Sequence, residues 1–349
     1  MSPQASFTSE WSRVRVVFGA GAIDRLPAEL DALALARVML VTTPGRARDL
    51  ATIRSGLGDR LVGVVDAAAL HVPVEHVRAG IAQVDALQPD VLLAFGGGSP
   101  IGLAKAIALD RPIPIAAVPT TYAGSEMTSI WGITDGEQKR TGRNPAVAPR
   151  LVIYDPVLTV SLPVAVSAAS GMNAVAHAVE AMYAAGASPI ALAAADEALR
   201  SLSRALPAVV ARPDALEARS LALRGAHAAA VALDLAAMGL HHKICHVLGG
   251  TFGLPHAPAH AAILPRVAAF NTPAAPAAMA RIAAAISADD AAIGLAALNR
   301  TLGLTMSLGA LGFRREDIGR AADLVVAASY ANPRSASRED VRDLLRDAL

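Results

Sequence analysis

The stretch PDVLLAFGGGSPIGLAKAI, residues 89–107, decides the fold of the first half of the chain. Its apolar run at 91–95 predicts a strand that is buried on both faces of a parallel sheet. Three glycines then predict a tight turn, and residues 101–107 have the composition of a helix. A glycine turn between a strand and a helix lets the backbone approach a phosphate, which the N–H groups and dipole of the helix can bind. An ordinary tight turn has the same composition, and the GxGxxG spacing is absent. The prediction of a phosphate site therefore depends on the place of the turn between a buried strand and a helix.

Similar short apolar runs, separated by helical segments, lie on both sides of this stretch. This alternation predicts a doubly wound, Rossmann-like parallel sheet and an α/β nucleotide-binding domain over residues 1–155. The further predicted strands are 14–18, 37–42, 61–65, 113–118 and 151–154.

Residues after the predicted strands are candidates for cofactor binding, because open α/β sheets bind ligands at the carboxyl ends of their strands. In the loop PTTYAGSE, Thr120, Thr121 and Ser125 offer hydroxyls, although a Thr-rich turn is the alternative. Thr42 follows the second strand, where the adenosine ribose is expected; no acidic residue stands there to reject NADPH, so both NADH and NADPH are open. Ser99 is expected to cap the helix after the glycine turn. The predicted cofactor residues are Gly96, Gly97, Gly98, Ser99, Thr120, Thr121, Thr42 and Ser125.

The second half of the chain changes character. Its long segments are rich in Ala and Leu and helical in period, and they predict an all-α domain over residues 156–349. We expect the active site in the cleft between the two domains. The predicted helices are 168–185, 189–212, 215–238 and 277–286.

A cluster of histidines marks the helical domain. Five of the nine histidines lie in GLHHKICHVLGGTFGLPHAPAH, and SGMNAVAHAVEAMY precedes it with Asn173 and His177. The pairs Asn173/His177 and His242/His246 have i,i+4 spacing, which places each pair on one face of a helix. Such a cluster is typical of a metal site or of a site that once held a metal. The five are His241, His242, His246, His256 and His260.

Together these segments resemble the iron-containing alcohol dehydrogenase superfamily, which includes dehydroquinate synthase and glycerol dehydrogenase. The carrying motifs are AFGGGSPIGLAKAIA, VPTTYAGSEMTSIWGIT, VIYDPVLTVSLP, SGMNAVAHAVEAMY, the histidine stretch and SYANPR. The resemblance is closest to the maleylacetate reductases of this superfamily. It implies a dehydroquinate synthase-like fold, a homodimer, and NADH- or NADPH-dependent reduction of maleylacetate to 3-oxoadipate in the catabolism of aromatic compounds.

The resemblance also implies a metal site, and the chain departs from it. The superfamily's alcohol dehydrogenases bind a divalent metal through one Asp and three His, at positions that hold Asn173, His177, His242 and His256 here. An amide brings no charge to a cation, so we expect a degenerate site and no metal requirement. Reduction of a conjugated double bond fits this expectation, because histidines can stabilise an enolate and deliver its proton.

Roles in the pocket follow from the resemblance. His242, His246 and Lys243 are the expected catalytic residues, for acid catalysis or enolate stabilisation. The expected contacts of the small dicarboxylate substrate are His177, His256, Asn173, Tyr122 and Arg334.

Composition excludes several classes of protein. A formal net charge of +1 gives no basis for binding nucleic acid or an anionic membrane, and the single cysteine excludes an internal disulfide framework. No secretory signal or membrane span is predicted, so a cytoplasmic enzyme is expected. The open alternatives are a metal-dependent alcohol dehydrogenase, a dehydroquinate synthase-like lyase that recycles NAD, and a nucleotide-binding protein without catalysis.

Overall fold

The computed structural model describes residues 14–44, 47–136, 138–327 and 329–349. Contacts divide the chain into two compact units, one ending at Leu162 and one beginning at Pro163. The predicted boundary lay after residue 155. The first unit also includes the 3₁₀ helix Pro156–Thr159. Asp155, the N-cap of this helix, accepts hydrogen bonds from the N–H groups of Gly21 (3.1 Å) and Ile23 (3.2 Å), and these bonds hold the helix to the first unit.

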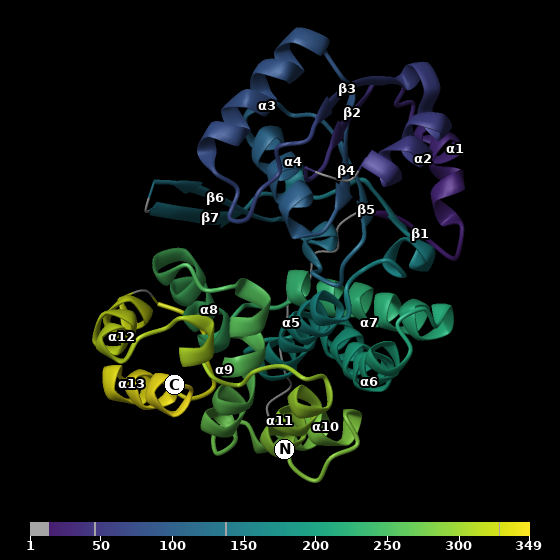
Figure 1. Ribbon diagram of the computed structural model, residues 1–349. Helices are drawn as coiled ribbons and strands as arrows, with labels where there is room; N and C mark the ends of the chain where they lie inside the picture. The colour runs from purple at the N-terminus through teal and green to yellow at the C-terminus, as the bar shows by residue number, and fades with distance from the viewer. Residues whose placement is uncertain (1–13, 45–46, 137, 328) are drawn as a thin grey trace. The chain divides into compact units, whose positions relative to one another are not determined.

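The first unit is built on a six-stranded, wholly parallel sheet (Figure 1), which confirms the predicted α/β class. The strand order is β1-β8-β5-β4-β2-β3. The chain leaves β2 toward β3 at one edge and then returns to β4, so the order reverses between β2 and β4, which is where such sheets bind ligands. The strands are β1 (Arg15–Phe18), β2 (Val38–Val41), β3 (Leu61–Val65), β4 (Val91–Gly96), β5 (Ile115–Pro119) and β8 (Leu151–Tyr154).

Helices cover both faces of this sheet. Figure 1 shows α1 (Leu26–Ala32) and α2 (Ala47–Leu57) on one face, and α3 (Val74–Leu87) and α4 (Gly98–Asp110) on the other. Leu30 of α1 and Leu57 of α2 pack with alternate strand residues such as Leu40 and Leu93 in one apolar cluster. Every residue of β4 is buried, as its uninterrupted apolar run predicts.

One element of the first unit was not predicted. Strands β6 (Ile130–Asp135) and β7 (Gln138–Arg143) pair antiparallel as a separate hairpin. The sequence QKRTGR of β7 contains no apolar run, so the pattern that predicts core strands gave no signal there.

The second unit is all-helical, as predicted. Its central helix α5 (Val164–Tyr183) is buried from Ser167 onward, and its abundant Ala and Gly let neighbouring helices approach closely. The others are α6 (Pro189–Ala211), α7 (Leu216–Leu235), α8 (Leu240–Phe252), α9 (His256–Asn271), α10 (Pro276–Ala285), α11 (Ala291–Thr301), α12 (Ile318–Val326) and α13 (Arg338–Asp347).

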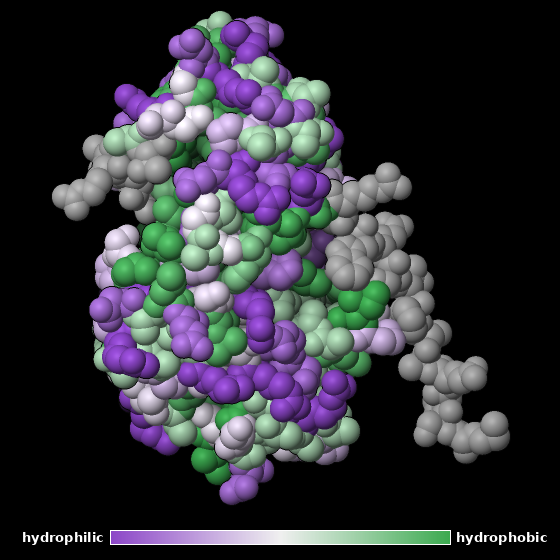
Figure 2. All heavy atoms as spheres, turned by 90° about the vertical axis from the view of Figure 1, so that its right-hand side faces the viewer, coloured by the Kyte–Doolittle hydropathy of each residue, from purple (hydrophilic) through white to green (hydrophobic). Residues whose placement is uncertain are grey.

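Hydrophilic and hydrophobic residues are mixed over the face drawn in Figure 2. Isolated exposed apolar side chains such as Leu70 and Ile293 are ordinary for a folded protein. Among the described residues, no single helix is long and apolar enough to cross a membrane, and α7 and α8 pass that test only together, as a pair bent by 101°.

Candidate functional site

The glycine turn after β4 leaves the start of α4 open. Gly96 has a φ of 137°, a conformation that side chains disfavour, and Gly97 is the N-cap of α4 with no side chain to accept from the helix. A Cβ at Gly97 would lie 3.0 Å from Cγ2 of Thr121, so the turn and the loop after β5 touch. Free N–H groups beside a glycine cradle fit a dinucleotide phosphate. The prediction that Ser99 caps α4 is wrong, because the helix already begins at Gly98.

The predicted cofactor residues around this turn differ in exposure. Thr120 continues β5, donating its N–H to the Gly96 carbonyl at 2.9 Å, and is buried, whereas Thr121 and Ser125 are partly exposed. Thr42 has no exposed surface and donates its hydroxyl to the Phe95 carbonyl at 3.1 Å. The predicted contact of Thr42 with a ribose is therefore not supported, since its hydroxyl holds β2 against β4.

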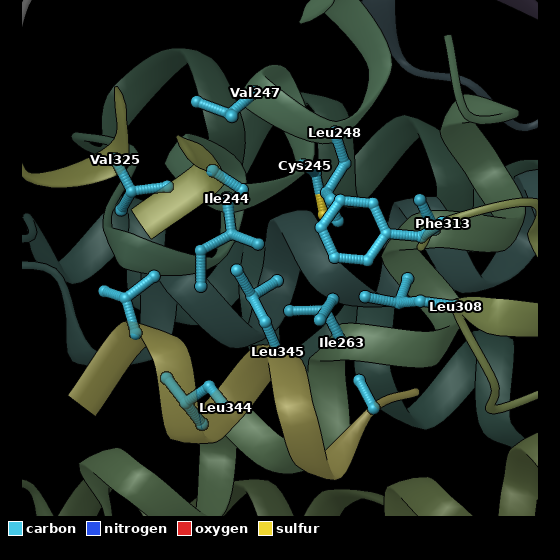
Figure 3. Packing of buried hydrophobic residues seen from close by; sticks show 14 of the residues in the cluster. Ile244, Cys245, Val247, Leu248, Ile263, Leu308, Phe313, Val325, Leu344 and Leu345 are labelled. Carbon is cyan, nitrogen blue, oxygen red and sulfur yellow. The ribbon is translucent and has the colours of Figure 1, made fainter. Parts of the chain in front are cut away.

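Three helices of the second unit, α5, α8 and α9, bring the histidines together. On α8, apolar residues occupy one side of the helix and His242 and His246 another. Ile244, Cys245 and Leu248 lie in an apolar cluster with α9, α12 and α13, shown in Figure 3. This packing leaves His242 and His246, one turn apart, on another side of α8. His256 and His260 lie one turn apart on α9 in the same way.

The histidine rings form a continuous group. The His177 and His242 rings stack with centroids 5.1 Å apart, and the His246 ring lies 6.1 Å from both the His242 and the His256 rings. The His260 ring lies 4.3 Å from the His256 ring. Rings from α5, α8 and α9 therefore meet in one group, and His256, which the sequence did not place on a helix, is the first residue of α9.

Glu180 is the functional candidate that sequence reasoning missed. Its Oε2 lies 2.6 Å from Nδ1 of His242, and it accepts the N–H groups of Gly239 and His241 at 2.8 Å each. Burial by itself raises the pKa of Glu180, but the charge and hydrogen bond of His242, the charge of His241 and the Gly239 N–H together lower it to about 2. An anionic Glu180 fixes Nδ1 of His242 as the donor and leaves Nε2 for chemistry.

A signal for Glu180 was present in the sequence. Glu180 is three residues after His177 and seven after Asn173, so all three lie on one face of α5. Its partner His242 is 62 residues further along the chain, and no local pattern links the two.

Behind the group lies a deeper pair of histidines. Nε2 of His241 is 2.9 Å from Nδ1 of His260, and Sγ of Cys245 is 3.8 Å from the same Nε2. Burial lowers the pKa of His241 to about 3 and that of His260 well below its usual value. Both rings are therefore neutral near pH 7, and burial raises the pKa of the Cys245 thiol, so this pair supports the site rather than donating protons.

The segment SYANPR fastens the start of α8. The side-chain carbonyl of Asn332 accepts the Leu240 N–H at 3.4 Å, and its amide donates to Asn271 at 2.7 Å.

Arg334, which the sequence predicts as a substrate contact, is bound to other residues of the protein. Its guanidinium lies 4.0 Å above the Phe270 ring and pairs with Asp340 at 3.1 Å, so its charge already has a protein partner.

Tyr122 and Lys243 are the two remaining residues that the sequence predicts for the pocket. Tyr122 belongs to the α/β unit and has no exposed surface. Lys243 follows His242 directly on α8, so its side chain leaves the helix about 100° away from that of His242, and it lies three residues before His246, on the neighbouring side.

The four positions implied for a metal offer only neutral donors. Asn173 supplies an amide, and Nδ1 of His177 and Nε2 of His242 are buried without a hydrogen-bond partner among the described residues. The buried carboxylate in this group, Glu180, already binds His242 and the start of α8. Burial, followed by the charges of the neighbouring rings, lowers the pKa of His177 well below its usual value. Imidazoles can bind zinc, and this set differs from the metal site implied by the resemblance in lacking its anionic ligand.

Comparison with known proteins gives one consistent result. The family model "Iron-containing alcohol dehydrogenase" matches residues 13–156, and "Fe-containing alcohol dehydrogenase family, C-terminal" matches residues 167–349. The chain is 47% identical over 334 residues to a maleylacetate reductase of Burkholderia cepacia, covering 96% of this chain and 95% of the relative. It is 50% identical over 348 residues to maleylacetate reductase 2 of Cupriavidus pinatubonensis, covering 98% and 96%. The crystal structure of maleylacetate reductase from Agrobacterium tumefaciens superposes with a TM-score of 0.95 at 41% identity, covering 99% of this chain and 98% of that one.

Proposed function

Since the chain belongs to the iron-containing alcohol dehydrogenase family and is an oxidoreductase, we propose that it reduces the conjugated carbon–carbon double bond of maleylacetate, giving 3-oxoadipate in the breakdown of aromatic compounds. Maleylacetate, NAD(P)H and a proton are consumed, and 3-oxoadipate and NAD(P)⁺ are formed. We choose this substrate because the chain is similar to maleylacetate reductases over nearly its whole length. The Glu180–His242 pair is the structural observation that supports the chemistry.

The cofactor is a nicotinamide dinucleotide, supported by the open start of α4 and the glycine cradle against Thr121. When bound, its reduced ring supplies a hydride to the carbon β to the substrate ketone. The residues proposed to hold it are Gly96, Gly97, Gly98, Ser99, Thr120, Thr121 and Ser125.

His242 acts on the charge that develops on the substrate. Hydride addition leaves an enolate, which needs a hydrogen-bond donor at its oxygen and then a proton at the α-carbon. His242 presents Nε2 for this purpose and can donate there when that nitrogen carries a proton, while Glu180 holds its Nδ1–H and keeps the ring in place. His246, on the same face of α8, and Lys243 are the other proposed catalytic groups.

The substrate is a dicarboxylate, and the proposed pocket is rich in nitrogen donors. His177, His256 and Asn173 surround His242 and His246, and the half-buried His246 and His256 are the more accessible members. Assembly as a homodimer and location in the cytoplasm stay predictions from the sequence.

The reaction is proposed to need no metal. Asn173 stands where a carboxylate is expected, and Glu180 is held by His242 and the N–H groups of α8. Proton donors therefore replace a Lewis acid in stabilising the enolate. A metal-dependent alcohol dehydrogenase is the main competing function.

The test follows the absorbance of NADH and of NADPH during incubation with maleylacetate, with and without EDTA. We expect oxidation of at least one dinucleotide, with product identified as 3-oxoadipate and rates unaffected by EDTA. No oxidation of either dinucleotide would overturn the proposed function. Loss of activity in EDTA that zinc or iron restores would overturn the metal-free reaction alone.

Replacing Asn173 with Asp restores an anionic donor to the neutral set. At an effective dielectric constant of 20, a charge pair 4 Å apart gains about 4 kcal/mol, so we expect Zn²⁺ to bind at least about 100-fold more tightly. Reductase activity should not rise. Calorimetric titration with Zn²⁺ measures the affinity, and Asn173→Ala is the control. Equal zinc affinity in wild type and Asn173→Asp would contradict the placement of the degenerate site.

A further inference from the structure

Resting on the proposed dinucleotide binding, we propose that Lys105 is a positioning residue for the cofactor. Its buried ammonium group ties the loop that follows β5 to α4, the helix that begins at the glycine turn. Lys105 would thereby fix the two segments that bind the dinucleotide relative to each other without touching the cofactor itself.

The bonding of Lys105 is complete within the protein. It has no exposed surface, although lysine is among the residues least often buried. Its Nζ donates to the carbonyl oxygens of Ser125 (2.6 Å), Thr128 (2.6 Å) and Ile130 (2.9 Å), and it lies 3.0 Å from the Thr128 hydroxyl. An ammonium group has three N–H donors, and here protein oxygens replace its water.

All of these acceptors belong to one short stretch of chain. Residues 125–130 form a single 3₁₀ turn and the start of β6, so most of their carbonyls have no ladder partner. Without Lys105, the carbonyls of Ser125, Thr128 and Ile130 would each lose a charged donor, which is costly for buried backbone, and the Ser125 carbonyl would keep, among the described residues, only the N–H and hydroxyl of Thr128 at 3.3 and 3.2 Å. Ser125 is the first residue of this stretch, and Thr120 and Thr121 precede it by only a few residues. The position of the stretch therefore determines where these three proposed cofactor residues lie.

The other end of the connection is rigid. Lys105 lies on α4 seven residues after Gly98, about 10 Å along the helix from its first residue. The helix start, with its open N–H groups, therefore moves with Lys105. Contact between Gly97 and Thr121 shows that the turn and the loop already lie within van der Waals range.

Lys105 also places a positive charge behind the proposed phosphate site. The neighbouring acid, Glu126, is buried and accepts the Tyr154 hydroxyl at 2.8 Å. A buried cation on α4 adds to the positive end of the helix dipole in attracting a pyrophosphate. Both effects predict the same loss when the ammonium is removed: weaker binding of dinucleotide by protein that is still folded.

The experiment compares Lys105→Met with wild type in fluorescence titrations with NADH, after circular dichroism and a melting curve confirm folding. We expect the Kd for NADH to rise at least tenfold and the KM for NADH to rise with it, while the KM for maleylacetate changes little. Glu29→Gln is the matched control: it neutralises another buried charge of the same unit, on α1 across the sheet, and should lower stability without changing the Kd.

A second variant covers the case in which Lys105→Met does not fold. Thr128→Val nearly keeps the side chain's shape and removes the hydroxyl, which accepts from Lys105 and from the Ile130 N–H and donates to the Ser125 carbonyl. We expect a two- to threefold rise in the Kd for NADH. An unchanged Kd in the folded variant, beside wild type that binds NADH, would overturn the role of Lys105 and leave the proposed function standing. Wild type that binds neither NADH nor NADPH would overturn the proposed function itself.

Discussion

Replacing His242 with Asn should lower kcat for maleylacetate reduction by about 10²- to 10⁴-fold, the usual contribution of a positioned proton donor. The amide of Asn can still reach Glu180 from the place of Nδ1, but nothing occupies the place of Nε2. The KM for NADH should change little, because the predicted dinucleotide residues belong to the α/β unit. Steady-state kinetics with saturating NADH measures the effect.

His246→Asn is the comparison for this experiment. His246 lies one turn from His242 on the same face of α8 and is partly exposed, whereas His242 is buried and held at Nδ1 by Glu180. We expect a smaller loss of kcat for His246→Asn. A larger loss there than in His242→Asn would move the proton-donor role to His246.

Replacing Glu180 with Gln should lower the free energy of unfolding by about 3 kcal/mol at pH 7. The pKa of Glu180 is about 2 in the folded protein against an ordinary value of 4.5, and each unit of difference corresponds to about 1.4 kcal/mol. Because the folded pKa is lowered, this stabilisation is fully present above about pH 4.5 and is lost as the pH falls toward 2. Urea unfolding of wild type and variant at several pH values measures both the size and the window.

The other carboxylates that titrate in the same pH range are present in both proteins. The difference in the free energy of unfolding between wild type and Glu180→Gln therefore reports on Glu180 alone. It should shrink steadily between pH 4.5 and the lowest pH at which wild type still folds. A difference that stays constant with pH would show that Glu180 is not held as a buried anion. As a positioning residue, Glu180 should also lower kcat when replaced, with little effect on the KM for NADH.

Much of the fold followed from local patterns. Strands β3 and β8 have the predicted bounds, and β1, β2, β4 and β5 differ by one or two residues at their ends. Buried parallel strands are continuous apolar runs, which stand out against helical segments. The hairpin β6–β7 was missed because it lies outside the parallel sheet and β7 carries no such run.

The site was predicted in position but not in its bonding. The spacing of Asn173, His177, His242 and His246 placed each pair on one helix face, and these faces meet in the structure. Two details differ from the predictions: Ser99 does not cap α4, because the helix already begins at Gly98, and the hydroxyl of Thr42 is donated to a carbonyl of the neighbouring strand β4. Tertiary contacts decide both details.

The sequence by itself determined the class of fold, the strands of the parallel sheet, and the placing of Asn173 with His177 and of His242 with His246 on one helix face each, because apolar period and residue spacing act within a few residues. Only the tertiary structure decided which histidines are buried and neutral, and which one holds a carboxylate. Glu180 and His242 are 62 residues apart, and their contact depends on how α5 and α8 pack. Lys105 shows the same limit in the α/β unit: its helix was predicted from local composition, whereas its partners at 125–130 are set by the packing of α4 against the loop after β5. Long-range packing fixes burial, and burial sets the charge states on which the proposed chemistry depends.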